Sequence, residues 1–188
     1  RPLGDYAPKE LARQIAVLPQ SREVPAITVE SLVMHGRFPY LGFPRKPRPE
    51  DRQAVQRAME QAGVEALRQK ALSALSGGER QKVYLAMVLA QDTPVILLDE
   101  PTAFLDLPNR YELATLLRRL TRDEGKCILF STHDLDVALS LCDSVALINT
   151  PSLHHLPAGE MVGSGLIERL FSGENARFDP ETRTVRLR

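Results

Sequence analysis

The sequence has no excess of charge of either sign. Its 188 residues include 24 lysines and arginines and 24 aspartates and glutamates, so the formal net charge is zero. Without a strong overall field, bulk charge favours neither nucleic acid nor an anionic membrane, and recognition of phosphate would require a local site. We therefore expect no nucleic acid partner.

Long apolar runs are also missing. No run approaches the roughly 20 apolar residues that a membrane-spanning helix needs. The first residues, Arg-Pro-Leu-Gly-Asp, lack the apolar stretch of a secretory signal. We expect a chain that spans no membrane by itself and that resides in the cytoplasm.

Cysteine is scarce, with only Cys127 and Cys142 in the chain. Their spacing is unlike that of a metal site, and both lie among apolar residues. This pattern predicts two buried thiols in a reducing compartment rather than a disulfide.

The residues that are present, 43% hydrophobic and 26% charged, suit a globular domain with a real core. Continuous apolar runs at 95–98, 127–130 and 145–148 are typical of strands buried on both faces of a parallel sheet, and 15–18 is a fourth candidate. Between the runs at 95–98 and 127–130, leucines at 113, 116, 117 and 120 have helical spacing. This predicts a doubly wound α/β fold whose ligand crevice lies at the carboxyl ends of the strands.

The middle of the chain differs in composition. Residues 23–90 are predicted to form a helical subdomain, with helices at 28–35, 50–62 and 76–90. Residues 1–22 and 91–188 are predicted to form the α/β core. Near the end of the chain, residues 151–157 are predicted to be a loop, on which His154 and His155 are solvent-exposed rather than metal ligands.

The motif Leu75-Ser-Gly-Gly-Glu79 opens the third of these helices, and two interpretations stay open. Ser76 and Glu79 form the pattern of a capping box. That box does not explain Gly77 and Gly78 in a first helical turn, where each costs up to about 1 kcal/mol relative to Ala. A phosphate at the helix N-terminus would explain them, because glycines let an anion approach the free backbone N–H groups.

Two adjacent carboxylates, Asp99 and Glu100, follow the strand at 95–98. Asp99 can hold Mg²⁺, and Glu100 can polarise a water that attacks a phosphoryl group. His133, just past the strand at 127–130, could bond the transferred phosphate; taken alone, it is more simply a histidine packed in a turn.

Five motifs in this order resemble the nucleotide-binding subunit of ATP-binding cassette (ABC) transporters. They are Gln20, Leu-Ser-Gly-Gly-Glu at 75–79, Leu-Leu-Asp-Glu-Pro-Thr at 97–102, Leu-Asp at 105–106 and Ser-Thr-His-Asp at 131–134. The resemblance implies a P-loop NTPase (RecA-like) parallel sheet with an inserted helical subdomain, which hydrolyses ATP with Mg²⁺.

The resemblance also implies a role for each motif residue. Glu100, His133 and Gln20 would be catalytic, and Asp99 and Gln20 would hold the metal. The nucleotide-binding residues would be Leu75, Ser76, Gly77, Gly78, Glu79 and Asp106. Asp106 can at the same time cap the helix that begins near Pro108.

The partners implied are a second ATP-binding subunit in a homodimer, transmembrane permease subunits and, indirectly, a substrate-binding protein, at the cytoplasmic face of the cell membrane. Residues 13–20, 28–30, 35–40 and 85–92 resemble importer subunits for ferric siderophores, haem and cobalamin. Phe38, Tyr40 and Phe43 either form an aromatic surface for the permease or pack on their own domain.

A phosphate-binding P-loop, Gly-x-x-x-x-Gly-Lys-[Ser/Thr], does not occur in the sequence. By resemblance it would precede Gln20, and its strand would lie between those at 127–131 and 145–149. We therefore expect the sequence to be an N-terminally truncated part of a longer ATPase, poorly stable and unable to bind Mg²⁺-ATP alone. The alternative is a non-catalytic fragment that acts as a binding or interaction module.

Overall fold

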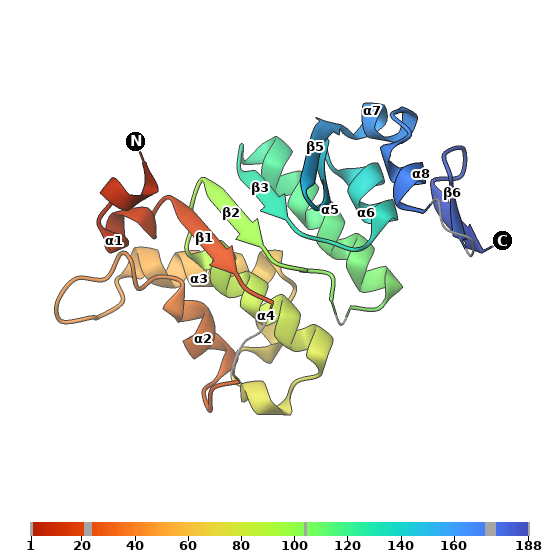
Figure 1. The fold of residues 1–188 in the computed structure, drawn as a ribbon. Coiled ribbons are helices and arrows are strands. Elements are labelled where there is room, and N and C mark those ends of the chain that lie inside the picture. The colour runs from red at the N-terminus through yellow and green to blue at the C-terminus, as the bar shows by residue number, and fades with distance from the viewer. Residues whose placement is uncertain (1, 21–23, 104, 172–175, 188) are drawn as a thin grey trace. The chain divides into compact units, whose positions relative to one another are not determined.

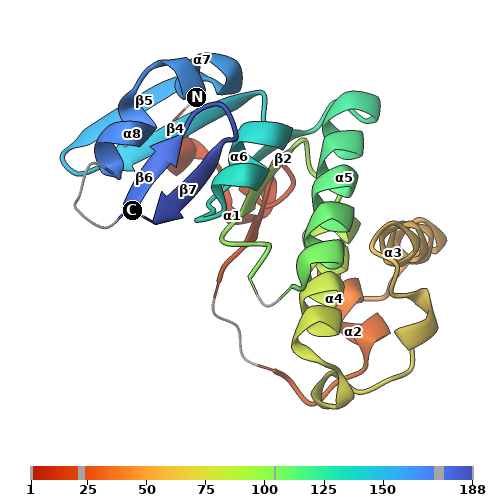
Figure 2. The same cartoon turned by 90° about the vertical axis from the view of Figure 1, so that its right-hand side faces the viewer.

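The computed structural model describes residues 2–20, 24–103, 105–171 and 176–187. They fold into two compact units, which divide after Ser131 (Figures 1 and 2). The predicted domain boundaries at 22 and 90 are a different division and stay a prediction, and residues 21–23 lie outside the described part.

A three-stranded parallel sheet forms the centre of the first unit, with strand order β1-β2-β3 (Figure 1). Its strands are β1 (Ile15–Leu18), β2 (Val95–Leu98) and β3 (Cys127–Phe130). Three of the four predicted strands thus have the predicted bounds and direction. Aliphatic side chains account for this pairing, since they pack on both neighbouring strands and neighbouring helices.

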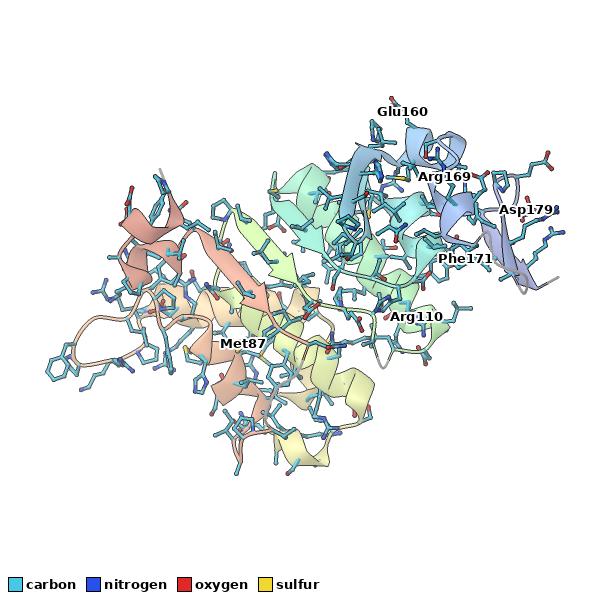
Figure 3. The ribbon with its side chains drawn as sticks, in the orientation of Figure 1. Met87, Arg110, Glu160, Arg169, Phe171 and Asp179 are labelled. Atoms are coloured by element: carbon cyan, nitrogen blue, oxygen red, sulfur yellow. The ribbon has the colours of Figure 1, made fainter. Side chains whose placement is uncertain are left out.

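Four helices lie at the predicted positions: α2 (Val29–His35), α3 (Pro49–Gln61), α4 (Gly77–Ala90) and α5 (Leu107–Asp123). The short helix α1 (Pro8–Leu11) and the 3₁₀ turns η1 (Leu3–Asp5), η2 (Glu65–Leu67) and η3 (Leu72–Ala74) were not predicted. Leu113, Leu116, Leu117 and Leu120 make the buried stripe of α5. Met87 of α4, labelled in Figure 3, packs against the same core.

The end of α2 approaches α4 very closely. A Cβ atom at Gly36 would lie 2.2 Å from the backbone oxygen of Met87. Only glycine fits there without moving one helix, so Gly36 sets the spacing between α2 and α4 as well as ending α2.

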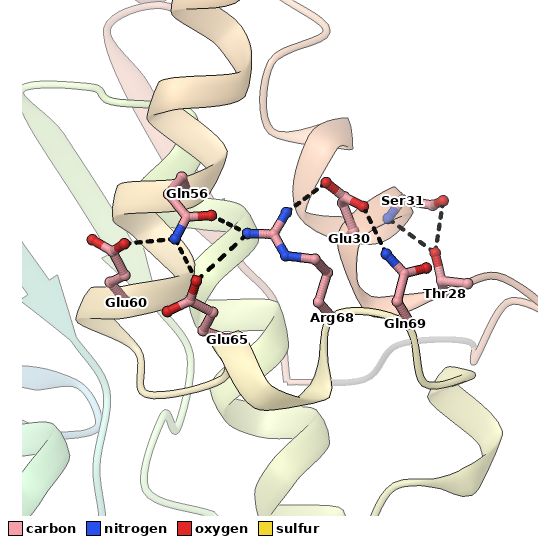
Figure 4. Close-up of polar contacts among 8 residues, drawn as sticks. All are labelled: Thr28, Glu30, Ser31, Gln56, Glu60, Glu65, Arg68 and Gln69. Carbon is pink, nitrogen blue, oxygen red and sulfur yellow. Dashed lines mark hydrogen bonds and ion pairs between the residues drawn. The ribbon is translucent and has the colours of Figure 1, made fainter.

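Polar side chains connect the first turn of α2 with the second half of α3 (Figure 4). The guanidinium of Arg68 donates to Glu30 at 2.6 Å and also to Gln56. Gln56 in turn donates to Glu60 and Glu65, both at 2.6 Å. This network fixes the turn at η2, which carries the chain from α3 towards the motif at 75–79.

The second unit has a small core of Leu139, Met161, Ile167 and Phe178. Phe171, labelled in Figure 3, packs against it. The elements are α6 (Leu135–Leu141), β4 (Ser144–Asn149), β5 (Ser152–Pro157), α7 (Ala158–Gly163), α8 (Leu166–Leu170), β6 (Ala176–Asp179) and β7 (Thr184–Leu187).

Residues 145–148 form a strand, as predicted, but the prediction that this strand belongs to the parallel sheet is wrong. β4 pairs with β5 in an antiparallel hairpin, and Ile148 is 71% exposed. Residues 151–157, predicted to be a loop, supply that second strand, because the turn at residues 150–151 folds the chain back within reach of β4. His155 lies on β5, where its Nε2 is 2.9 Å from the Ser144 hydroxyl.

The prediction of two buried thiols is also wrong. Cys127 is exposed and Cys142 is half-buried, and both are free thiols. In β3, Cys127 and Leu129 are exposed, so the described residues do not cover one face of this strand. Burial raises the pKa of the Cys142 thiol above its usual value. Among the described residues, no helix has the length and apolarity needed to cross a bilayer.

Candidate functional site

The carboxyl ends of the three parallel strands hold the candidate site. The backbone N–H of Asp99 donates to the Leu18 carbonyl at 2.8 Å, and that of Ser131 donates to the Leu98 carbonyl at 3.0 Å. The sheet pairing therefore continues one residue past each strand, and it fixes Asp99 and Ser131 side by side.

Ser131 connects the two adjacent carboxylate residues. Its hydroxyl donates to Asp99 Oδ1 at 2.6 Å and accepts from the backbone N–H of Glu100 at 2.9 Å. Glu100 has a φ of +45°, a backbone conformation that costs a non-glycine residue of order 1–3 kcal/mol. The bond from Glu100 N–H to Ser131 helps to hold that conformation, which turns the chain sharply after β2.

Gln20 belongs to the same cluster. Its side-chain amide donates to Glu100 Oε2 at 2.9 Å, across 80 residues of sequence. The structure thus brings together three residues predicted for this site, Gln20, Asp99 and Glu100, and it adds Ser131. Ser131 stood within the motif at 131–134, but nothing in the sequence alone indicated that its hydroxyl bridges two acids.

The capping box predicted at the start of α4 is confirmed. The Ser76 hydroxyl accepts from the Glu79 backbone N–H at 3.2 Å, and Glu79 Oε2 accepts from the Ser76 backbone N–H at 2.8 Å. The bond from the Ser76 backbone holds the pKa of Glu79 below its usual value. Gly77 and Gly78 form the first helical turn inside this box, so their backbone N–H groups lie at the positive end of a 14-residue helix.

One contact ties α4 to the turn that carries Glu100. The buried side chain of Gln81 donates to the Pro101 carbonyl at 2.8 Å. Leu75, just before the cap, is 5% exposed and belongs to the core of the first unit. The start of α4 is thus anchored on one side by packing and on the other by the Glu100 turn. Gln81 was not among the residues predicted from the sequence.

Asp106 caps α5, as the sequence suggested. Its Oδ1 accepts from the Asn109 backbone N–H at 3.0 Å, and this bond holds the pKa of Asp106 below its usual value. Its further role in nucleotide binding stays a prediction.

His133 belongs to the second unit. It is exposed in the turn before α6, between Thr132, which accepts from the Asp134 backbone N–H at 3.0 Å, and Asp134, which caps the helix. The turn itself explains this local structure, and a catalytic role for His133 stays a prediction.

The oxygen-rich cluster fits magnesium only as a partial site. No group of three His, Cys, Asp or Glu side chains suited to a metal occurs in residues 2–20, 24–103, 105–171 and 176–187. Mg²⁺ usually keeps several waters and takes one or two carboxylates together with substrate phosphates. Asp99 would supply one carboxylate ligand to such a site, the amide of Gln20 is held next to it through its bond to Glu100, and phosphate oxygens would complete it.

Three similarities identify the family. Residues 1–103 match the model of the ABC transporter family. The chain is 42% identical to the achromobactin transport ATP-binding protein CbrD of Dickeya dadantii, over 86% of this chain and 61% of that protein. It is 40% identical to the hemin import ATP-binding protein HmuV of Streptomyces coelicolor, over the whole chain and 66% of that protein.

A solved structure agrees with the fold. A dimeric post-hydrolysis state of the ATP-binding cassette MJ0796, bound to ADP and Pi, superposes with a TM-score of 0.70 at 25% identity, covering 82% of this chain and 68% of that one. The chain spans about three fifths to two thirds of the length of these proteins. Since the family match covers more than half of its 188 residues, the chain belongs to the ABC transporter family.

Proposed function

We propose that this chain is part of the ATP-hydrolysing subunit of an ABC importer. The observation that supports it best is the cluster of Gln20, Asp99, Glu100 and Ser131 at the carboxyl ends of the sheet. Parallel α/β sheets bind ligands at this edge. Two carboxylates and an amide held there suit phosphoryl transfer to water better than any other chemistry that these side chains offer.

In the proposed mechanism, Glu100 is the general base. A water next to its carboxylate is oriented for in-line attack on the γ-phosphate and gives up its proton to that carboxylate. Gln20, which bonds Glu100, positions the carboxylate and senses the phosphate end of the nucleotide. Asp99 and Gln20 would hold Mg²⁺, which supplies positive charge against the phosphate oxygens.

The start of α4 would contact the same nucleotide from a second subunit. Ser76, Gly77 and Gly78 offer backbone N–H groups and a positive helix end to a γ-phosphate held mainly by the partner. Leu75 and Glu79 support this loop from either side, and Asp106 and His133 would complete the dimer site. ATP binding thus closes a homodimer, and hydrolysis opens it again.

The cargo is proposed from the relatives. Achromobactin and hemin are named in the descriptions of CbrD and HmuV. We propose a ferric siderophore or a related iron chelate, carried through permease subunits that receive it from a substrate-binding protein. The subunit would then lie at the cytoplasmic face of the membrane as a peripheral protein.

Uptake by cells tests this assignment. Deleting the gene that encodes the whole protein should abolish uptake of one radiolabelled ferric chelate while uptake of unrelated amino acids is unchanged. Restoring the gene should restore uptake. If no iron chelate depends on the gene but hydrolysis of ATP by the purified protein is normal, the cargo is wrong and the ATPase assignment stands.

Ser131 is expected to act as a positioning residue in this reaction. Ser131→Ala removes the donor to Asp99 and the acceptor of the Glu100 N–H, so kcat should fall about tenfold or more while KM for ATP stays nearly unchanged. Ser131→Thr keeps the hydroxyl and should restore most of the rate.

A matched control is Ser140→Ala, which removes a similar bond from a serine hydroxyl to a carboxylate, that of Asp136, on α6. Steady-state ATPase assays of the three variants separate the effects. An unchanged kcat for Ser131→Ala, with Glu100 still essential, would show that the bridge does not position the base.

A further inference from the structure

A fully exposed phenylalanine lies on the loop between α2 and α3. Phe43 has a relative exposure of 101%, against 38–71% for the other exposed large apolar side chains of the described residues. Single exposed apolar side chains are common on protein surfaces, so exposure alone says little. The residues around Phe43 decide what it can do.

Positive charge is concentrated beside this ring. Residues 36–49 contain no acid, and the exposed side chains of Arg45, Lys46 and Arg48 follow Phe43 within five residues. The next acids, Glu50 and Asp51, lie in the first turn of α3, where Asp51 is buried against Arg37. In a chain of zero net charge, this loop is a distinct basic patch with an apolar tip.

The root of the loop is held firmly by two further cations. Lys9 donates to the Leu41 carbonyl at 2.7 Å, and Arg13 donates to the Pro39 carbonyl at 3.0 Å. The guanidinium carbon of Arg37 lies over the Tyr40 ring, 3.9 Å from the centroid of that ring. Beyond this anchored base the loop extends away from the helices, at the left of Figure 1. The base is therefore fixed while the tip is free to meet a surface.

We propose that residues 42–48 contact an anionic lipid bilayer. The Phe43 ring would enter the boundary between head groups and acyl chains, and Arg45, Lys46 and Arg48 would lie against lipid phosphates. An amphipathic element binds such a surface through its apolar area together with attraction to anionic lipid. This contact is independent of ATP hydrolysis, since none of these residues belongs to the candidate site.

A protein partner is the competing occupant, and the charges favour lipid. Three exposed cations within five residues of Phe43, with no acid among residues 36–49, would need a matched acidic patch on a protein. A layer of anionic phosphates meets them in any orientation. The exposed tip also offers one apolar ring, which suits shallow insertion better than a broad protein interface.

The lack of tryptophan in the sequence makes a direct experiment possible. Phe43→Trp in the whole protein introduces an indole at the tip, and its emission is taken as the difference between the variant and the unsubstituted protein. Its emission should shift to the blue with vesicles of phosphatidylcholine and phosphatidylglycerol, and brominated lipids should quench it. Pure phosphatidylcholine should give a much smaller shift. Leu153→Trp, at a site 64% exposed in the second unit, is the matched control and should not respond.

Co-sedimentation with the same vesicles gives the energetic test. Phe43→Ser and the double variant Arg45→Glu/Lys46→Glu should each lower the partition coefficient about tenfold or more. Arg52→Glu/Arg57→Glu makes the same change of charge on exposed residues of α3 and should leave it within about twofold.

Three results would overturn the proposal. The first is no blue shift with anionic vesicles. The second is loss of binding on charge reversal with no effect of Phe43→Ser, which leaves only nonspecific attraction. The third is a shift that requires permease subunits in the vesicles, which would assign the loop to a protein partner.

Discussion

The Glu100→Gln variant of the whole protein is expected to hydrolyse ATP about 10²–10⁴-fold more slowly than the wild type, while it still binds ATP. Glutamine has nearly the same shape as glutamate but cannot accept the proton of the attacking water. It can still accept the Gln20 side-chain bond through its amide oxygen. The turn at φ +45° is held by backbone contacts that the substitution leaves in place.

Two measurements define this prediction. ATP turnover should fall by the stated factor, and size-exclusion chromatography with Mg²⁺-ATP should show a dimer that persists, since the step that opens it is blocked. Glu112→Gln is the control, because Glu112 is an exposed carboxylate paired with Lys82 on α4 at 2.9 Å. Near-normal hydrolysis by Glu100→Gln would remove Glu100 from the role of base, whatever happens to the control.

Local sequence patterns predicted most of the first unit. The apolar runs at 15–18, 95–98 and 127–130 became three parallel strands, and Ser76 with Glu79 became a reciprocal cap. The cap depends on residues close together in sequence, and the three strands each show the same pattern, a continuous run of apolar residues. Parallel strands end at one edge, which explains why Gln20, Asp99 and Glu100 lie together, but Gln20 was chosen as a site residue because of the motif resemblance to the ABC family.

Features that depend on what covers a strand were not predictable in this way. The apolar run at 145–148 resembles that at 95–98, yet β4 pairs with β5 in a hairpin. An apolar run indicates that a strand can be buried, but the covering layer comes from elsewhere in the chain. Cys127 is exposed for the same reason, because no described residue covers its face of β3. The hydrogen bonds of Ser131 to Asp99 and Glu100 depend on how β2 and β3 are aligned, and the sequence pattern does not indicate that alignment.

A buried ion pair in the helical part should dominate the stability of α3. Arg37 Nε donates to Asp51 Oδ1 at 3.0 Å, their side chains are 10% and 6% exposed, and Arg37 also donates to the Ala90 carbonyl at 2.9 Å. Arg37→Met should destabilise this region by about 3–5 kcal/mol, because it leaves a buried carboxylate without its partner. Hydrogen exchange of the α3 amides measures the loss.

Two controls test that reason. Arg57→Met, on the exposed face of α3, should change stability by less than about 0.5 kcal/mol. Arg37→Met/Asp51→Asn should recover much of the loss, because no charge remains buried and the asparagine oxygen can still accept from the Arg48 backbone N–H, as Asp51 does at 3.0 Å. A double variant as unstable as the single one would mean that lost packing, not the carboxylate, causes the effect.

The pH dependence separates these causes further. Burial opposes ionisation of Asp51, but the Arg48 backbone N–H and the Arg37 guanidinium outweigh it and hold its pKa below the usual value. A lowered pKa gives the wild type stability that is present above the unfolded pKa of about 4 and is lost as pH falls through the folded pKa. Without Arg37, burial should raise the pKa instead, so acidification towards pH 4 should stabilise Arg37→Met. Opposite slopes of exchange protection with pH are therefore expected for the two proteins, and parallel slopes would contradict the role of the ion pair.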